Sequence, residues 1–501
     1  MTPRPSADNE RAPLLPAAAA ADEPHLLPRP PAATATDAKL PRRSIVVFVV
    51  CTLSLFLVML AASVMEPAAS EVVEEIICRG VYPDIAGGRD PRCKSNAVQG
   101  ELSTIDGWSL PLFLVPGIVT AVPYGILADT HGRRLGIGLC MLGMVLQQGA
   151  MLVIYAFPHV FPIRAIWFAA LFTFVGGGGT VLNALIFATI SSVAPGAHKT
   201  LLFSYLGAAV TAAQLVGSPL AWLIMRRSAW LTIYISFALL VLGAFCAVCI
   251  PDTCSAAKSA DSRSSATWKL RDVCKASFVK RQLIAAGQTV RHIFRTQFLE
   301  QRTLGLLLSS LLFTTLGKSF TVLLAQYVAR RFGWTWGQTG LLGSLQGGIT
   351  LGTTSLVIPL LDRLLRLKWS WTLFEKDIFL AQLSLAIMVT GFFGIGIAST
   401  SAVMLAFLCW TSLSRGHEFI MRSLLAQAAG EANAAVVYTT NSVLETAGIA
   451  MAGPLLAAAF QKGLSWGGVW LGFPFFVASA LVFVGSCLLQ TPNAATFGSF
   501  K

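Results

Sequence analysis

Long apolar segments alternate with short polar connections along most of the chain. The apolar runs repeatedly reach about 20 residues, the length that an α-helix needs to cross about 30 Å of hydrocarbon. The pattern predicts an all-α polytopic membrane protein. It places about 12 transmembrane helices near residues 44–65, 108–128, 135–157, 166–193, 201–225, 230–250, 304–328, 339–361, 378–398, 401–426, 434–460 and 466–489.

Three segments interrupt or flank this pattern. Residues 1–43 are rich in Ala, Pro and Leu without a helical period and are expected to form a disordered cytoplasmic tail. Basic residues just before the first span favour a cytoplasmic N-terminus, and an even number of spans returns residues 491–501 to the cytoplasm. Residues 252–303 carry many lysines and arginines and few acids, which predicts a basic cytoplasmic linker between bundles at 44–251 and 304–490.

Composition supports the membrane assignment and excludes other classes. Of the 501 residues, 55% are hydrophobic and 12% charged, about half the charged fraction of an average soluble domain. The net charge of +13 reflects lysines and arginines gathered in loops, so nucleic-acid binding is not expected. Gly176–Gly179 is not followed by the Lys and Ser or Thr of a phosphate-binding loop, and no His-Glu-x-x-His spacing occurs. Cys246 and Cys249 have Cys-x-x-Cys spacing, but they lie inside a hydrophobic run without His partners. We therefore expect neither an enzyme nor a bound cofactor or metal.

The connection between the second and third spans has a distinctive composition. Residues 124–134 read YGILADTHGRR, with Gly125, Asp129, Gly132, Arg133 and Arg134 in a short turn. Glycines permit a tight reversal, and the arginines hold the turn on the cytoplasmic side. An ordinary hairpin with basic anchors would also have these properties. The spacing G-x-x-x-D-x-x-G-R-R nevertheless resembles the loop signature of the major facilitator superfamily (MFS), in which the loop acts as a conformational switch.

Two features recur at nearly the same offset in the second half of the chain. Asp129 has a counterpart 233 residues later in Asp362. Pro219, after Gly217, has one 235 residues later in Pro454, after Gly453. Two coincidences on corresponding spans predict an internal repeat of two pseudo-symmetric six-helix bundles. The Gly-Pro pairs are expected to serve as helix-packing motifs.

The resemblance extends to other stretches. Residues 93–102, 125–134 and 437–458 look like a fungal branch of the MFS that often accompanies secondary-metabolite pathways and is distantly similar to proton-coupled folate-type carriers. This resemblance implies export of a small organic molecule in exchange for protons. The antiporter signature G-x-x-x-G-P is matched only in part, since Ser218 separates Gly217 from Pro219.

Ionisable residues inside predicted spans are candidates for the transport site, because a charge in the bilayer is costly. Lys318 lies midway along the seventh span, and Arg415, His417 and Glu418 lie in the tenth. Glu445 lies in the eleventh at a depth similar to that of Arg415, about 15 Å from the cytoplasmic end. We expect Glu445, paired with Arg415, to change protonation during transport; a static ion pair is the alternative. Lys318 either attracts an anionic solute or snorkels, and His417 either relays protons or packs.

Uncharged polar residues in the spans are further candidates for a substrate cavity. Asn183, Gln214 and Asn441 are such groups, although each is equally suited to an interhelical hydrogen bond. Cys78 and Cys93 both lie in the polar loop after the first span, and a disulfide between them is expected if that loop faces outside.

The preferred function is a proton-coupled efflux pump for a small organic molecule, such as a fungal secondary metabolite or toxic compound. Proton-coupled uptake of a nutrient or organic anion is the alternative. A monomer in the lipid bilayer is the default, and the cell membrane is the expected location. Two acidic dileucine patterns in the N-terminal tail (Glu10 with Leu14 and Leu15, Asp22 with Leu26 and Leu27) leave the vacuolar membrane as a second location.

Overall fold

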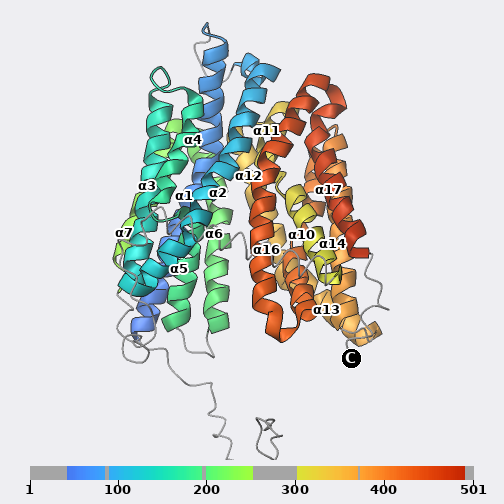
Figure 1. Ribbon diagram of the computed structural model, residues 1–501. Coiled ribbons are helices and arrows are strands. Elements are labelled where there is room, and N and C mark those ends of the chain that lie inside the picture. The colour runs from blue at the N-terminus through green and yellow to red at the C-terminus, as the bar shows by residue number, and fades with distance from the viewer. Residues whose placement is uncertain (1–41, 85–89, 194–198, 252–301, 370–372, 491–501) are drawn as a thin grey trace, which may run out of the picture. The chain divides into compact units, whose positions relative to one another are not determined.

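The computed structural model describes residues 42–84, 90–193, 199–251, 302–369 and 373–490. The expected tails and almost all of the expected basic linker lie outside these residues, and so do both dileucine patterns. The described part is helical (Figure 1). Its first half contains α1 (Arg42–Val81), α2 (Asn96–His131), α3 (Arg133–Ala156), α4 (Ile166–Ala169), α5 (Gly178–Val193), α6 (Lys199–Met225) and α7 (Ala229–Val248).

The second half begins after the linker. It contains α10 (Arg302–Lys318), α11 (Thr321–Phe332), α12 (Trp336–Gly352), α13 (Ile358–Trp369), α14 (Leu373–Ile397), α15 (Ser401–Ser412), α16 (His417–Trp466) and α17 (Phe473–Gln490). In Figure 1 the helices α1 to α7, blue to green, and the helices α10 to α17, yellow to red, form two groups.

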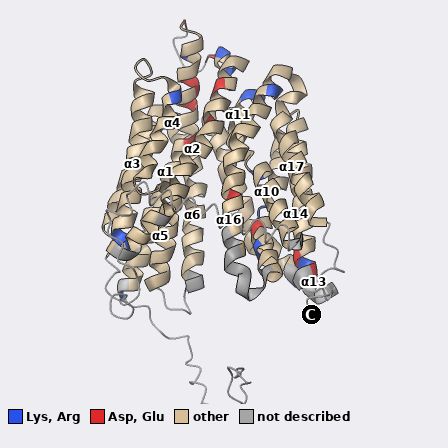
Figure 2. Ribbon diagram, viewed as in Figure 1, with Lys and Arg blue, Asp and Glu red and all other residues tan. Residues whose placement is uncertain are grey.

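Eleven helical segments of the described chain are long and apolar enough to cross a membrane. Large apolar side chains such as Phe168, Phe245, Leu356 and Phe419 are more than half exposed, as expected for helices that face lipid. Figure 2 shows most charged residues toward the helix ends, with tan residues through the middle. The predicted class, an all-α polytopic membrane protein, is confirmed.

The expected tenth span, residues 401–426, does not form a continuous apolar helix and is not among those eleven segments. α15 ends at Ser412, turns follow, and α16 starts at His417 and continues through the expected eleventh span. The sequence around this break contains Ser414, Arg415 and Gly416, which are polar or small and do not favour an uninterrupted apolar span.

The first two membrane helices are longer than the apolar pattern predicted. α1 contains 40 residues and runs through Pro67 to Val81, so the expected loop of about 40 residues is wrong. The helical spacing of buried Val73 and Ile77 continues the apolar face beyond the predicted end. α2 likewise begins at Asn96. Glu66, Glu71, Glu74 and Glu75 therefore lie on α1, where their side chains have defined directions.

The expected fourth span contains a break. Gly176, Gly177 and Gly178 have φ angles of 91°, 85° and 67°, a conformation that favours glycine, and α5 begins after this turn. A Cβ on Gly176 would lie 2.4 Å from Cα of Cys140 on α3. The glycines therefore allow both the turn and close packing.

Within each group, helices that are not consecutive in the chain pack side by side. α1 packs against α6 and α7, and α3 packs against α5 and α7. In the other group, α10 packs against α16 and α17, and α14 packs against α17. The groups meet where α2 contacts α16 and where α6 contacts α12. These two contacts bring together residues that lie more than 100 positions apart in the sequence.

Candidate functional site

The turn between α2 and α3 is built as the motif predicted. α2 ends at His131, Gly132 has a φ of 105°, and α3 starts at Arg133. Arg133 Nη1 donates a hydrogen bond of 2.8 Å to the carbonyl oxygen of Ala188 on α5. The arginine thus ties the turn to the end of another membrane helix. The Asp129 side chain lies outside the described part, and the switch role of the motif stays a prediction.

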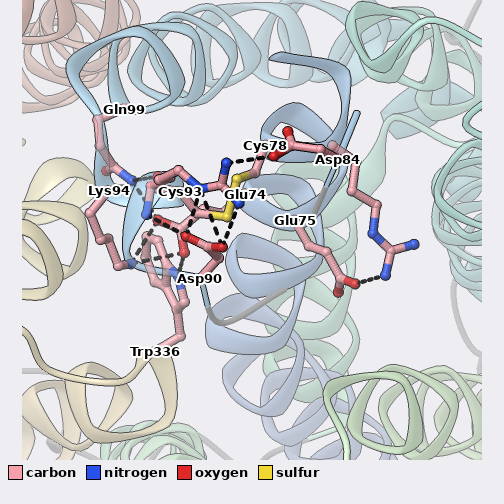
Figure 3. Close-up of a disulfide and its surroundings, with 11 residues drawn as sticks. Glu74, Glu75, Cys78, Asp84, Asp90, Cys93, Lys94, Gln99 and Trp336 are labelled. Atoms are coloured by element: carbon pink, nitrogen blue, oxygen red, sulfur yellow. Dashed lines mark hydrogen bonds and ion pairs between the residues drawn. A yellow bond between two sulfur atoms is a disulfide. The ribbon is translucent and has the colours of Figure 1, made fainter. Parts of the chain in front are cut away.

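A buried glutamate connects the two halves at the end where α1 stops. Glu74 on α1 is 3% exposed. Lys94 Nζ lies 2.6 and 2.8 Å from its two carboxylate oxygens, and Gln99 Nε2 also donates to it (Figure 3). From the other half, Trp336 Nε1 at the start of α12 donates a hydrogen bond of 2.6 Å to Glu74 Oε2. The carboxylate charge is therefore compensated by groups from both halves of the chain.

A disulfide fixes the segment that supplies Lys94. Cys78 near the end of α1 is bonded to Cys93 in the 3₁₀ helix η1 (Pro91–Lys94). Asp90 caps this short helix, accepting a hydrogen bond of 2.8 Å from the Arg92 amide. The Arg92 guanidinium donates to Asp90 and Asp84, and these hydrogen bonds hold the pKa of both carboxyls below their usual range.

Other hydrogen bonds join the halves beside Glu74. Gln326 Nε2 on α11 donates to the carbonyl oxygen of Gln99 at 2.7 Å and to its side-chain oxygen at 3.1 Å. Further along α2, Gln461 Nε2 of α16 donates to Thr104 Oγ1 at 2.7 Å. We call the set Glu74, Lys94, Gln99, Gln326 and Trp336 the interhalf network.

Glycines let α2 and α16 cross with their backbones in contact next to this network. A Cβ on Gly453 would lie 2.3 Å from the carbonyl oxygen of Gly107, and a Cβ on Gly107 would lie 2.6 Å from Cβ of Ala457. Gly453 was expected to serve helix packing, and the structure places that packing between the halves. Its counterpart Gly217 lies where α6 meets α1, since a Cβ there would lie 2.7 Å from Cβ of Ser63. The prolines that follow, Pro219 and Pro454, lie inside α6 and α16.

Lys318 and its neighbours form a second polar group within the C-terminal half. Lys318, at the end of α10, forms an ion pair with Glu418 near the start of α16. His417 is 1% exposed, and neither ring nitrogen has a hydrogen-bond partner in the described chain. Arg415 donates a hydrogen bond of 3.0 Å to the side-chain oxygen of Gln346 on α12. The cavity between these groups has a volume of about 20 Å³, room for about one water molecule.

The expected pairing of Glu445 with Arg415 is wrong. Glu445 Oε2 instead lies 3.8 Å from Arg422 Nη2 on α16. The prediction treated residues 401–426 as one straight span, whereas the turns before α16 redirect Arg415 toward Gln346. Both members of the observed pair remain accessible, with side chains 49% and 29% exposed.

The three uncharged polar candidates lie on different helices. Asn183 on α5 is half-buried, Gln214 on α6 is exposed and Asn441 on α16 is buried. None of them lines the cavity beside Lys318, so a role in binding substrate stays a prediction for each.

Some residues of the interhalf network lie outside every predicted span. Glu74 and Gln99 fall between the first two spans, where the apolar pattern predicts a polar loop, and Trp336 falls between the seventh and eighth. The continuing helical spacing of apolar residues around Glu74 was the signal that could have revealed its place on a helix. Its contact with Trp336, 262 residues away, carries no local signal.

Comparison with known proteins places these features in a family. The sequence profile described as Major Facilitator Superfamily matches residues 51–453. An MFS efflux pump of Emericella nidulans, atnC, is 28% identical over 469 residues, covering 91% of this chain and 90% of that protein. The efflux pump ustT of Aspergillus flavus is 25% identical over 433 residues, covering 84% and 83%.

Solved structures agree on the fold. A D-xylose–proton symporter superimposes with a TM-score of 0.58 at 14% identity, covering 89% of this chain and 97% of its own. The human organic anion transporter MFSD10 superimposes with a TM-score of 0.54 at 16% identity, covering 90% and 100%. The profile match spans most of the chain, and the membrane helices have the expected arrangement. This chain is a multi-pass membrane transporter that belongs to the Major Facilitator Superfamily.

Proposed function

We propose that the protein exports a small organic molecule, such as a fungal secondary metabolite or toxic compound, across the cell membrane. The observation that carries this proposal is similarity to fungal efflux pumps along about nine-tenths of the chain, at 28% identity to atnC. In this proposal a monomer carries out transport, since one chain contains both halves of the fold.

The interhalf network supports a cycle in which the halves separate and rejoin at the disulfide end. Its contacts are mainly hydrogen bonds to one carboxylate and to amides, which water can replace when the halves part. Glu74 keeps Lys94, a partner from its own half, so its charge stays compensated in either arrangement. At the opposite end of α2, Arg133 ties the motif turn to α5. In this proposal the protein closes at that end when it opens at the disulfide end.

Proton coupling in this proposal resides in Glu445 and Arg422. The 3.8 Å separation and partial exposure of the pair suit an interaction that breaks and reforms. Lys318 and Glu418 form a more enclosed pair nearby and would hold α10 against α16 during the cycle.

The Glu445→Gln variant tests the coupling. In inverted membrane vesicles with an imposed pH gradient, the variant should lose pH-driven accumulation of the cargo, by at least about tenfold, because glutamine cannot bind and release a proton. Glu75→Gln is the matched control, since Glu75 also forms an exposed pair with an arginine on its own half. Undiminished pH-driven transport by a folded Glu445→Gln protein would refute the assignment.

Export itself is tested by comparing small molecules in cells and medium with and without the gene. The deletion should cause one compound to accumulate inside cells and disappear from the medium. A compound left unconsumed in the medium would instead establish uptake and overturn the proposal. A fluorescent tag on the intact chain in the same cells should label the cell membrane. A signal at the vacuolar membrane would contradict the proposed location.

A further inference from the structure

A cavity of about 360 Å³ lies among the helices of the N-terminal half. Its walls come from α1, α2, α3 and α7, together with Ile166 at the start of α4. All of these elements belong to one half of the chain, so the cavity is separate from the contact between the halves. Its volume falls within the range of about 300–1,000 Å³ typical of small-molecule sites.

Two carboxylates line this cavity. Glu66 on α1 is exposed to it, and Asp106 on α2 is half-buried. Neither carboxylate takes part in a side-chain hydrogen bond or ion pair within the described chain, and no lysine or arginine is among the described lining residues. A positive charge bound between two carboxylates inside a membrane helix bundle relieves the repulsion between them, so the pair favours a cation.

A buried tyrosine provides a second, independent indication of a ligand. Tyr155 on α3 lines the cavity and is 2% exposed, yet its hydroxyl has no hydrogen-bond partner within the described residues. The hydroxyl is therefore available to form a hydrogen bond with water or a ligand that enters the cavity. Gln147 and Gln148 on the same helix add amide groups to the wall.

The rest of the wall is apolar and determines the kind of cation that fits. It includes the thioether side chains of Met65, Met144 and Met151, which adapt to the apolar body of a ligand. It also includes the ring of Phe113, whose face attracts cations. An inorganic ion fits poorly, because the described residues contain no group of three metal-ligating side chains. The cavity is also much larger than a single ion or water molecule needs.

We propose that this cavity binds a small organic cation, a protonated or quaternary amine with an apolar body, whose positive charge lies between Glu66 and Asp106. The Tyr155 hydroxyl and the two glutamine amides bind the ligand's polar atoms or its retained water. The site is independent of the proposed direction of transport, because binding to it requires no flux.

Calorimetric titration of the purified full chain in detergent tests the proposal with benzyltrimethylammonium as the probe. The wild-type protein should bind this cation, and it should not bind benzenesulfonate, an aromatic anion of similar size. The double variant Glu66→Gln and Asp106→Asn should bind the cation at least about tenfold more weakly, since both counter-charges are removed. Asp84→Asn is the matched control, because Asp84 is an exposed acid that lies outside the cavity.

The outcomes separate the proposal from its alternatives. Undiminished cation binding by the double variant, or equal binding of benzenesulfonate to the wild type, would overturn it. If the double variant elutes as an aggregate, the single variants and Tyr155→Phe replace it, and each should weaken binding; unchanged binding in all three would be equally decisive. If deletion of the gene leaves the compounds in cells and medium unchanged while the purified protein binds the cation, the proposed function is rejected and this site stands.

Discussion

Replacing Trp336 with phenylalanine removes one hydrogen bond from the interhalf network while keeping an aromatic ring. The indole Nε1 donates to Glu74 Oε2 at 2.6 Å, and Glu74 is 3% exposed. A hydrogen bond to a charged group contributes about 1.5–3 kcal/mol. Glu74 retains Lys94 and Gln99, so we expect a loss near the lower end of this range. This hydrogen bond joins the two halves, and its loss should therefore raise the population opened at the disulfide end by about tenfold or more.

A cysteine at position 103 reports this opening. Ser103 lies one helical turn beyond Gln99 on α2 and is fully buried. With the free cysteines replaced by serine and Cys78 and Cys93 retained, a membrane-impermeant maleimide should modify Ser103→Cys in proportion to the open population. Trp336→Phe should raise this rate about tenfold or more. Trp334→Phe is the control, since no hydrogen bond to its indole is described. Equal rates for the two variants would refute the assigned role of the Trp336 hydrogen bond.

Two further predictions concern the same end of the molecule. Gly453→Ala should disfavour the closed arrangement by about 1–3 kcal/mol and raise thiol labelling, because its Cβ would lie 2.3 Å from the Gly107 oxygen. Gly100→Ala, on α2 with open space around it, should leave labelling unchanged, and equal effects of both alanines would contradict the packing argument. Removing the disulfide by Cys78→Ala with Cys93→Ala should lower stability by about 3 kcal/mol, as expected for a closed loop of 15 residues. Thermal unfolding in detergent should show a lower midpoint, and a reductant should reproduce that shift in the wild type but leave the variant unaffected; an unchanged wild-type midpoint would argue against a stabilising disulfide.

The fold class could be predicted from the sequence because its determinants are local. Twenty apolar residues in succession specify a membrane helix wherever they occur, and Gly132 and Arg133 specify a turn with a basic anchor in a few positions. The matched Gly-Pro pairs also pointed to helix packing, which Gly217 and Gly453 both serve. These features depend on short stretches of sequence and on the bilayer as solvent.

The partners of the charged residues could not be predicted in the same way. Depth counting placed Arg415 and Glu445 together on the assumption of straight spans, but a turn before α16 gave Glu445 a different arginine. Lys318, expected to attract a solute or snorkel, is paired with Glu418 instead. Small changes in helix direction move a side chain by several ångströms, which exceeds the range of a hydrogen bond.

The amino-acid pattern alone thus determined most membrane helices, the motif turn and the family. The helices follow from the pattern because backbone groups in lipid must form hydrogen bonds within a helix long enough to cross the bilayer. Only the tertiary structure decided that α1 and α2 continue past their apolar cores, and that Glu74 receives a hydrogen bond from Trp336 in the other half. It also decided that Glu66 and Asp106 line one cavity with Tyr155. Contacts between residues far apart in sequence depend on how whole helices cross, and that geometry arises from the summed packing of both halves.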